Sequence, residues 1–417
     1  MTELSVSVII VSRGRPQSLC RCLTAVSQLL YKTFEIVVVV DTAGFDAVTK
    51  LSFSDRIKIS KFDDVNISTA RNHGLTLAAG EIVAFIDDDA VPEPAWLLHL
   101  VQPFKNPMVS AAGGFVRGRN GISYQWQGQE IDEFGYSKDI TITTEQPTIV
   151  SAGPGKAIKT QGTNCAFRRS TLAEIGGFDP AFRYYLDEAD VNFRLAERGN
   201  ATAIVPRAEV HHCYEASETR LQNRVPKSLF EIGASQAIYL RKHASVERFD
   251  EVLKGFCEAQ RATLIRHMIA GNCEPGDVGV VMSTLNDGIL EGLSRSIVPL
   301  PVIAQSDLPF CVFRQNDDAR DHRIICGYRI HARRLRRQAE ETVRRGYNVS
   351  LYLFSRTARF HRLSYRNGYW EQAGGIFGKS VRSEPVFQFT RLKQRLKKET
   401  QRVLLRRDPL DTAERIS

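Results

Sequence analysis

The sequence has 417 residues, of which 43% are hydrophobic and 25% charged, and its formal net charge is +9. Its length predicts two or three domains, and its composition is that of a globular protein with a sizeable core. No stretch approaches the run of about 20 apolar residues that spans a bilayer. The N-terminal residues lack the basic leader of a signal peptide. We therefore expect a cytoplasmic protein.

The cysteines and the charge distribution narrow the possible kinds of site and partner further. The eight cysteines form no CxxC pair, which excludes the usual zinc and redox motifs and leaves reduced, mostly buried thiols as the expectation. The segment from Arg320 to Ser417 holds 24 Lys and Arg against 9 Asp and Glu, so it carries +15 and the rest of the chain −6. Such a basic tail favours phosphate, lipid headgroups or nucleic acid as partners.

Strands and helices alternate in the first 90 residues, which predicts a doubly wound α/β sheet covered on both faces. Ligands of such sheets bind beyond the carboxyl ends of the strands, where Asp41 and Asp87–Asp89 stand. The expected strands are 6–11, 35–40, 56–60 and 81–86, and the expected helices are 17–30 and 68–79.

The rest of the chain gives less regular patterns. We assign no elements to 120–159, which is rich in Gly, Gln and Thr. Helical patterns dominate 226–296, and a basic helical segment closes the chain. The expected strands are 110–118, 201–205 with 209–212 just beyond, 323–328 and 348–354, and the expected helices are 170–175, 187–198, 332–346 and 388–407.

Three adjacent carboxylates, Asp87, Asp88 and Asp89, directly follow the apolar run EIVAFI. Because side chains two apart on an extended segment point the same way, Asp87 and Asp89 can share one ligand. Carboxylate oxygens suit Mg²⁺ or Mn²⁺, which also bind a diphosphate. The alternative is a solvated loop that caps the next helix.

The segment STARNHGLTLAAGEIVAFIDDDAVPEPAWL resembles the nucleotide-sugar signature of glycosyltransferase family 2, which has the GT-A fold. The resemblance extends, in order and spacing, over residues 5 to about 217. It is carried further by VSVIIVSRGRP, EIVVVVD, QGTNCAFRRSTLAEIGGFDPAFRYYLDEADVNFRLAERG and AEVHHCYEAS. It implies a GT-A catalytic domain at 1–217. The patterns of the remaining residues predict a helical region at 218–300 and a basic α/β region with a helical tail at 301–417.

The resemblance also implies roles for individual residues. Asp87 and Asp89 take the family's metal-binding DXD positions, with Mn²⁺ or Mg²⁺ as the ion and Asp89 the more direct ligand. One of His211 and His212 approaches the metal or diphosphate, since adjacent residues of a strand point to opposite faces. The residues expected around the nucleotide, diphosphate and donor sugar are Ser12, Arg13, Arg15, Asp41, Arg71, Asn72, Asp87, Asp88 and Asn164.

The acids of DEAD are the candidates for the catalytic base. Glu188 aligns with the family's base, and Asp187 is the alternative because the order of the acids differs from the usual Glu-Asp-x-Asp. Asp190 stands one helical turn before Arg194, which predicts an ion pair rather than a catalytic role.

The function so implied is inverting, metal-dependent transfer of a hexosyl-type sugar from a nucleotide-diphosphate donor to an acceptor hydroxyl. A saccharide or lipid-linked saccharide acceptor, in polysaccharide or glycolipid assembly, is expected. The alternatives are a nucleotidyltransferase that makes an activated sugar, a nucleic-acid-binding protein, and a degenerate transferase that only binds. No nucleic-acid-binding motif supports a nucleic acid partner.

The basic tail suggests a further partner. In RLKQRLKK, Leu392 and Leu396 form a narrow apolar stripe within a basic collar, a pattern typical of a membrane-surface helix. We therefore expect an anionic membrane as a partner and a peripheral position at the inner face of the plasma membrane. The alternative is a basic helix docked on the acidic N-terminal part of the chain.

Overall fold

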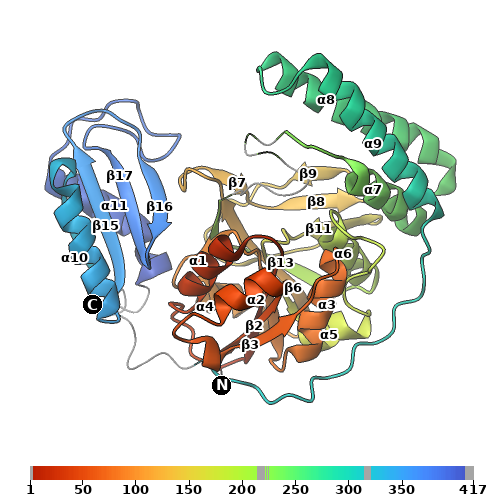
Figure 1. Cartoon of the computed structure of the whole chain (residues 1–417), viewed down its shortest axis with the longest axis horizontal. Helices are drawn as coiled ribbons and strands as arrows, with labels where there is room; N and C mark the ends of the chain where they lie inside the picture. Colours follow the sequence, from red (N-terminus) through yellow and green to blue (C-terminus); the bar gives the residue numbers. More distant parts are fainter. Residues whose placement is uncertain (1–2, 214–220, 222, 224, 314–320, 409–417) are drawn as a thin grey trace.

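The structure, a computed structural model, describes residues 3–213, 221, 223, 225–313 and 321–408. A large mixed sheet with helices on both faces forms the first part of the chain (Figure 1). A helical region and a smaller sheet with its own helices follow it.

The large sheet has ten strands, eight of them in the order β10-β13-β6-β12-β4-β1-β2-β3. Strands β1 to β4 are parallel, β12 runs antiparallel to both β4 and β6, and β13 is parallel to β6. The sheet is therefore mixed, and the predicted doubly wound α/β fold is confirmed. The strands are β1 (Val6–Ser12), β2 (Phe34–Val40), β3 (Lys58–Lys61), β4 (Ile82–Ile86), β5 (Ala90–Pro92), β6 (Val109–Arg117), β7 (Tyr124–Trp126), β10 (Thr148–Val150), β12 (Asn164–Arg168) and β13 (Ala201–His212).

Helices cover both faces of this sheet because its strands are apolar on both sides. In β1, Val8 and Ile10 belong to one core cluster and Ile9 to the other. The first cluster holds α1 (Pro16–Val26), α2 (Thr42–Val48) and α4 (Trp96–Leu100); the second holds α3 (Ile67–Leu77), α5 (Arg169–Glu174) and α6 (Asp187–Glu197).

Two stretches differ from the expected elements. The strand expected at 201–205 continues to His212 as β13, past register shifts against β6 between Val205 and Val210. The unassigned stretch 120–159 contains a second, three-stranded sheet in the order β11-β8-β9. Its strands are β8 (Gln129–Asp132), β9 (Ser137–Asp139) and β11 (Lys156–Lys159). Short strands with exposed faces give weak periodicity, which explains why the sequence did not reveal them.

The helical region consists of α7 (Phe230–His243), α8 (Phe249–Ile269) and α9 (Pro275–Ser294). Helices α7 and α9 cross closely because two glycines of α9 allow backbone contact. A Cβ on Gly288 would stand 1.9 Å from the carbonyl oxygen of Phe230, and one on Gly292 would stand 2.4 Å from that of Ala234. The expected domain boundary at 217 lies outside the described residues.

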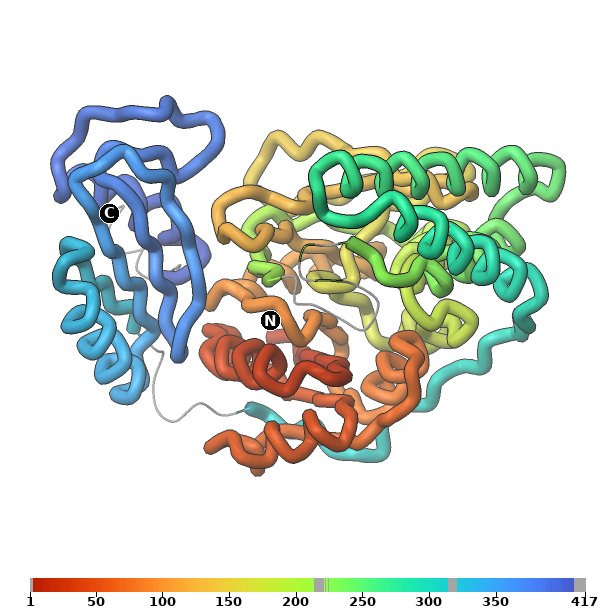
Figure 2. The backbone as a smooth tube through the Cα atoms, turned by 45° about the horizontal axis from the view of Figure 1, so that its top comes forward, coloured from red at the N-terminus to blue at the C-terminus, as the bar shows by residue number. Residues whose placement is uncertain are grey.

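After α9, the chain returns along the first domain as an extended segment (Figure 2). Phe313 packs against Phe34 and Phe53 at ring-centroid distances of 5.5 and 5.7 Å. The amide of Cys311 donates to the buried carboxylate of Glu35 at 2.9 Å. The expected division at 300–301 falls within this segment, so the domain limits remain a prediction.

The smaller sheet has the order β14-β15-β17-β16, with β16 antiparallel at its edge. The expected strand–helix–strand unit forms, and the hairpin β16–β17 adds to it. The elements are β14 (His322–Tyr328), α10 (Ala332–Arg344), β15 (Asn348–Ser355), β16 (Arg362–Arg366), β17 (Tyr369–Gly375) and α11 (Leu392–Arg407). Short 3₁₀ helices lie at Ser54–Arg56, Gln102–Lys105, Val246–Arg248 and Arg329–His331.

Helix α11 corrects the interpretation of the basic tail. Its stripe of Leu392 and Leu396 packs against an apolar cluster of the small sheet that contains Tyr352 and Phe354. The stripe therefore packs against the C-terminal region itself, and only the last turn of the helix meets the first domain, to which the alternative assigned the docking. A membrane partner remains a prediction. No described helix has the length and apolarity needed to cross a bilayer.

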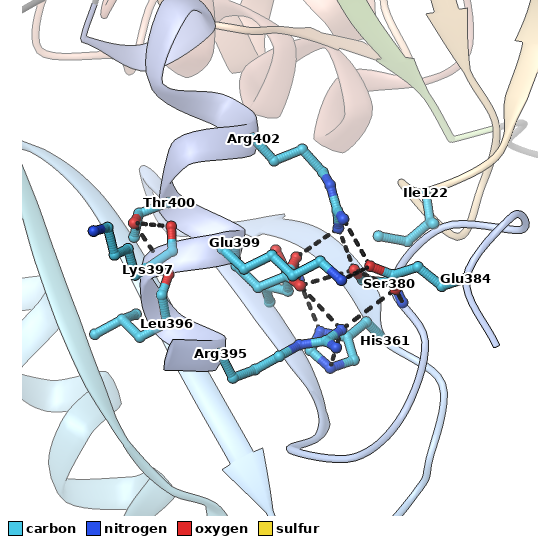
Figure 3. A network of polar contacts seen from close by, with 12 residues as sticks. Ile122, His361, Ser380, Glu384, Arg395, Leu396, Lys397, Glu399, Thr400 and Arg402 are labelled. Atoms are coloured by element: carbon cyan, nitrogen blue, oxygen red, sulfur yellow. Dashed lines mark hydrogen bonds and ion pairs between the residues drawn. The ribbon is translucent and has the colours of Figure 1, made fainter. Parts of the chain in front are cut away.

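Several charges of α11 are likewise paired within the protein. Arg395, only 1% exposed, pairs with Glu399 at 3.0 Å, and Arg402 reaches both Glu399 and Glu384 (Figure 3). The last turn contacts the first domain, where Arg406 pairs with Glu209 at 2.7 Å. Much of the positive charge of this helix is therefore paired with carboxylates of the same protein.

Arg407 makes the most buried of these contacts between the two parts of the chain. Its Nε and Nη2 donate to the two carboxylate oxygens of Glu93 at 2.8 and 2.9 Å, and both residues are 1% exposed. Burial alone would raise the pKa of Glu93, but Arg407 and then His211 hold it well below its usual range.

We expect Arg407→Met to lower the free energy of unfolding by about 3–5 kcal/mol, because it leaves the Glu93 carboxylate buried without its partner. Urea unfolding followed by circular dichroism measures this. Arg333→Met removes the same charge from an exposed position on α10 and should change stability by no more than about 0.5 kcal/mol. Equal small effects of both variants would show that the Arg407–Glu93 pair does not stabilise the docked tail.

Candidate active site

Two acids and a histidine meet at the carboxyl end of β4. Asp87 and Asp89 follow β4 directly, and His212 ends β13, which pairs with β5 in the register His212↔Ala90. One ligand atom from each of Asp87, Asp89 and His212 lies within 4.8 Å of the other two, and His212 Nε2 stands 3.1 Å from Asp89 Oδ1. Burial lowers the pKa of His212, but its hydrogen bond to Asp89 and the charges of Asp89 and Asp87 together raise it above its usual value. We call these three residues the metal cluster.

The donor set of the metal cluster fits a divalent cation. Two carboxylates and one imidazole suit Mn²⁺, and carboxylates with free positions for phosphate oxygens suit Mg²⁺. The alternation of side chains along β13 places His211 on the other face, where its Nε2 meets Glu93 Oε1 at 2.9 Å. Of the two histidines, the structure brings only His212 to the cluster.

Asp88 points away from the metal cluster and organises the loop after β1. Ser12 Oγ donates to Asp88 Oδ2 at 2.5 Å, and Arg15 Nη2 meets Asp88 Oδ1 at 2.7 Å. Burial raises the pKa of Asp88 to about 7, although Arg15 and Ser12 act against it. Arg15 also approaches Asp89 at 3.4 Å, so it lies beside the metal cluster.

Asp41 lies at the end of β2 and holds the same loop from the other side. Its two carboxylate oxygens accept from the amides of Gly44 and Gly14, each at 2.8 Å. Gly14 has a φ of 71°, a conformation that glycine adopts without strain. Arg13, one residue earlier, is exposed. The structure thus gathers Ser12, Arg13, Arg15 and Asp41 at the strand ends, where we expect the nucleotide.

Arg71 joins the metal cluster to the acids of α6. Its Nη1 pairs with Asp187 Oδ2, and its Nη2 lies 3.6 Å from Asp87 Oδ1 and 3.3 Å from the carbonyl oxygen of Gly162. Burial lowers the pKa of Arg71, yet the charges of Asp187 and Asp87, with a smaller contribution from Glu188, raise it. One buried cation therefore links carboxylates that come from two different parts of the fold.

Helix α6 begins with a strained turn that presents its first acids. Tyr185 and Leu186 have φ values of 73° and 62°, which residues with a side chain rarely adopt and which cluster at functional sites. Asp187 follows and is taken up by Arg71. Burial, and then the charge of Asp187, raises the pKa of Glu188 to about 7, against the opposing effect of Lys159 and Arg71.

Three other polar residues have structural contacts. Asp190 forms the expected pair with Arg194 at 2.7 Å. Asn72 exchanges two hydrogen bonds with the backbone of Phe178, and the buried Asn164 bonds two carbonyl oxygens and the indole of Trp96. The amide groups of Asn72 and Asn164 are thus engaged in the protein interior, and contact of these two residues with the donor remains a prediction.

Residues of the C-terminal region contact His211 and Glu93 next to the metal cluster, and the sequence analysis did not predict these contacts. Trp370 lies 4.6 Å from His211 between ring centroids, and Arg407 binds Glu93, which in turn binds His211. The sequence holds no local signal for these contacts, because the side-chain partners of Glu93 are more than 100 residues away from it.

Comparison with known proteins identifies a family for the first part of the chain. Residues 7–176 match the model of Glycosyl transferase family 2. The glucosyl-dolichyl phosphate glucuronosyltransferase of Haloferax volcanii is 29% identical over 186 residues, which cover 42% of this chain and 56% of that protein. The pre-mycofactocin glycosyltransferase of Mycobacterium tuberculosis is 27% identical over 182 residues, 42% of this chain and 35% of that protein.

The match therefore spans about half of the first relative's length, and a smaller share of the second. A crystal structure of GalNAc-T7 with UDP, GalNAc and Mn²⁺ aligns with 70% of this chain and 56% of its own, with 17% identity and a TM-score of 0.45. The family match and the mixed α/β sheet agree with the predicted GT-A fold class. The domain that carries Arg71, Asp87 and Asp89 belongs to glycosyl transferase family 2.

Proposed function

We infer that this chain is an inverting glycosyltransferase, which moves a sugar from a nucleoside-diphosphate donor to an acceptor hydroxyl. The observation that carries this proposal is the contact of Arg71 with Asp87 on one side and Asp187 on the other. It brings a cation-binding cluster next to a carboxylate whose pKa is shifted toward neutrality, Glu188. Such a pairing serves a reaction that loses a diphosphate and needs a base.

The donor would lie across the carboxyl ends of the strands. The loop of Ser12 to Arg15, held by Asp41 and Asp88, borders the nucleotide position, and Asp87, Asp89 and His212 would hold Mn²⁺ or Mg²⁺. When bound, the cation offsets the negative charge that develops on the leaving diphosphate. Arg71 adds a fixed positive charge on the side that faces α6.

Glu188 would accept the proton of the acceptor hydroxyl. Because Asp187 is already paired with Arg71, Glu188 is the acid left to act as the base at the start of α6. The acceptor oxygen then forms a bond to the anomeric carbon as the bond to the diphosphate breaks, on the opposite side of the ring. One displacement of this kind inverts the anomeric configuration and needs no protein nucleophile.

The acceptor remains a prediction. The name of the first relative gives a sugar on a lipid phosphate, and that of the second gives pre-mycofactocin, so the relatives do not share one acceptor class. We propose a saccharide or lipid-linked saccharide. A position beside a membrane remains a prediction, because the apolar stripe of α11 packs against the small sheet.

A screen of nucleotide sugars tests the proposed function. We expect the full chain to hydrolyse one donor slowly with Mn²⁺ or Mg²⁺ and without an acceptor, because water can replace the acceptor hydroxyl. Release of nucleoside diphosphate is the readout. Glu188→Gln in the same screen controls for contaminating hydrolases. If no nucleotide sugar is bound or hydrolysed with either metal, a sugar-transfer function is overturned.

A further inference from the structure

Large apolar side chains are exposed at one end of the small sheet. Strands β14, β15 and β17 run parallel, so the segments that follow them lie at the same end. In Figure 1 the segments after β15 and β17 loop beyond the strands. Folded proteins rarely gather several exposed apolar groups unless a partner covers them. The apolar residues of these segments that are more than half exposed are Ile330, Phe360, Val386, Phe387 and Phe389.

Contacts between neighbouring segments bring the phenylalanines into one surface. The ring centroid of Phe377 lies 5.4 Å from that of Phe387 and 6.2 Å from that of Phe389. Two residues after Phe377, Lys379 places its Nζ 4.7 Å from the centre of the Phe360 ring. The segment 377–379 therefore joins the exposed rings on its two sides. We call Phe360, Phe377, Phe387 and Phe389 the aromatic patch.

The aromatic patch is anchored to the small sheet beneath it. Phe377 packs against the same apolar cluster as the leucine stripe of α11. The amide of Gln388 donates to the carbonyl oxygen of Phe377 at 2.9 Å, and Lys398 Nζ donates to Gln388 Oε1 at 2.9 Å. The residue between Phe387 and Phe389 is thus bonded to the segment after β17 and to α11. The two rings are exposed on a backbone that the fold holds in place.

The chain around the aromatic patch is strongly basic. Residues 356–398 hold 11 Lys and Arg and only two acids, Glu371 and Glu384. Glu371 is 5% exposed and pairs with Arg336 at 2.7 Å, and Glu384 pairs with Lys398 at 2.6 Å. Both acids of this stretch are therefore neutralised by contacts within the protein. The exposed cations of the segments that carry the patch, and of the start of α11, are Arg359, Arg382, Arg391 and Lys393.

An anionic bilayer is the partner whose chemistry fits both features. Apolar side chains enter the boundary between headgroups and acyl chains, and surrounding Lys and Arg bind anionic headgroups. A single-stranded nucleic acid also pairs phosphates with cations and stacks its bases on aromatic rings. The exposed side chains of Ile330 and Val386 are aliphatic and have no ring face on which a base could stack. The mixture of aliphatic and aromatic groups therefore favours the bilayer.

We propose that this end of the small sheet binds an anionic lipid bilayer. Phe387 and Phe389 enter the interface, and Arg359, Arg382 and Arg391 contact the headgroups. Membrane contact then falls on the loop before α11 and not on the leucine stripe of the helix. The last turn of α11 is bound to the first domain, so the active site is held near the bilayer. Its use there on a lipid-linked acceptor rests on the proposed function, whereas the binding itself does not.

Flotation of the full chain with lipid vesicles tests the aromatic part of the surface. We expect binding to vesicles of phosphatidylglycerol and phosphatidylcholine at low salt. The double variant Phe387→Ser, Phe389→Ser should bind about tenfold more weakly or worse, because it loses the apolar area that enters the bilayer. The double variant Val280→Ser, Leu290→Ser removes two exposed apolar side chains from α9 and should bind as the unmodified chain does.

The same assay tests the cations. Arg382→Ala and Arg391→Ala should each weaken binding at low salt by roughly fivefold, the usual effect of one basic residue near an anionic leaflet. High salt should weaken binding of the unmodified chain, because it screens these charges. Arg344→Ala removes the same charge from the last turn of α10, at the opposite end of the small sheet, and should have no such effect.

A direct measurement of insertion does not depend on loss of binding. In Phe389→Trp, brominated acyl chains should quench the added fluorescence, whereas in Val280→Trp they should not. The surface is overturned if the chain does not bind the anionic vesicles, or if the two double Ser variants bind them equally well. Phenylalanine-dependent binding of a single-stranded oligonucleotide, without binding to vesicles, also overturns it. Glu188→Gln should bind vesicles normally, so a failure of the transfer reaction leaves this result readable.

Discussion

Replacement of Asp89 by Ala is expected to abolish sugar transfer, with a loss of roughly 10³-fold or more. Asp89 contacts His212 within the metal cluster, and its other carboxylate oxygen lies 3.4 Å from Arg15. The variant removes a ligand from a site that we expect to stabilise the leaving diphosphate by several kcal/mol, and each 1.36 kcal/mol is tenfold in rate. Initial rates with the donor found in the screen measure the effect, and excess EDTA should act in the same way.

The two adjacent histidines offer a matched control. His212→Ala should weaken Mn²⁺ binding, measured by calorimetry, whereas His211→Ala should leave it nearly unchanged, because His211 faces Glu93 and lies outside the metal cluster. Full activity of the unmodified chain in EDTA would remove the metal from the mechanism. It would leave the family assignment untouched, since that rests on residues 7–176 as a whole.

The first domain was predictable because its strands have an unambiguous pattern. The apolar runs of β1, β2 and β4 are buried on both faces, and each ends at a polar loop residue. Since the carboxyl ends of parallel strands share one edge, the apolar runs alone predict that Asp41 and Asp87–Asp89 lie at the same edge of the sheet. The choice between His211 and His212 required the structure. Alternation along β13 predicts that the two side chains point to opposite faces of the sheet, but it does not say which of them points to the metal cluster.

The C-terminal region shows why the remaining contacts could not be predicted from the sequence. An apolar stripe on a basic helix gives the same spacing whether it meets a membrane or a sheet, so Leu392 and Leu396 could not distinguish the two. The pairing of Arg407 with Glu93 joins residues 314 positions apart, and nothing local to either residue indicates the other. The engaged amides of Asn72 and Asn164 also depend on distant backbone atoms.

The second large effect is expected when the proposed catalytic base, Glu188, is replaced. Glu188→Gln should lower turnover by roughly 10²–10⁴-fold, the usual scale of general base catalysis, and should leave donor binding nearly intact. The amide keeps the shape of the side chain and loses its ability to take the acceptor proton. Turnover and the donor dissociation constant, measured on the same preparation, separate these two effects.

Asp187→Asn is the matched comparison, because Asp187 is the neighbouring acid and pairs with Arg71. We expect it to weaken donor binding as well as turnover, since Arg71 loses its partner beside the metal cluster. If Asp187→Asn loses all activity while its donor affinity is kept, and Glu188→Gln remains active, the base is Asp187 and the alignment of the acids is displaced by one residue.

The pH dependence gives an independent test of Glu188. A base must be deprotonated to accept a proton, and burial together with the charge of Asp187 raises the pKa of Glu188 to about 7. The ratio kcat/KM should therefore be low in acid, rise with pH through about 7 and level off above it. In Glu188→Gln that rise should disappear, because the amide does not titrate. A rise through about pH 7 that persists unchanged in Glu188→Gln would assign the titration to another group and exclude Glu188 as the base.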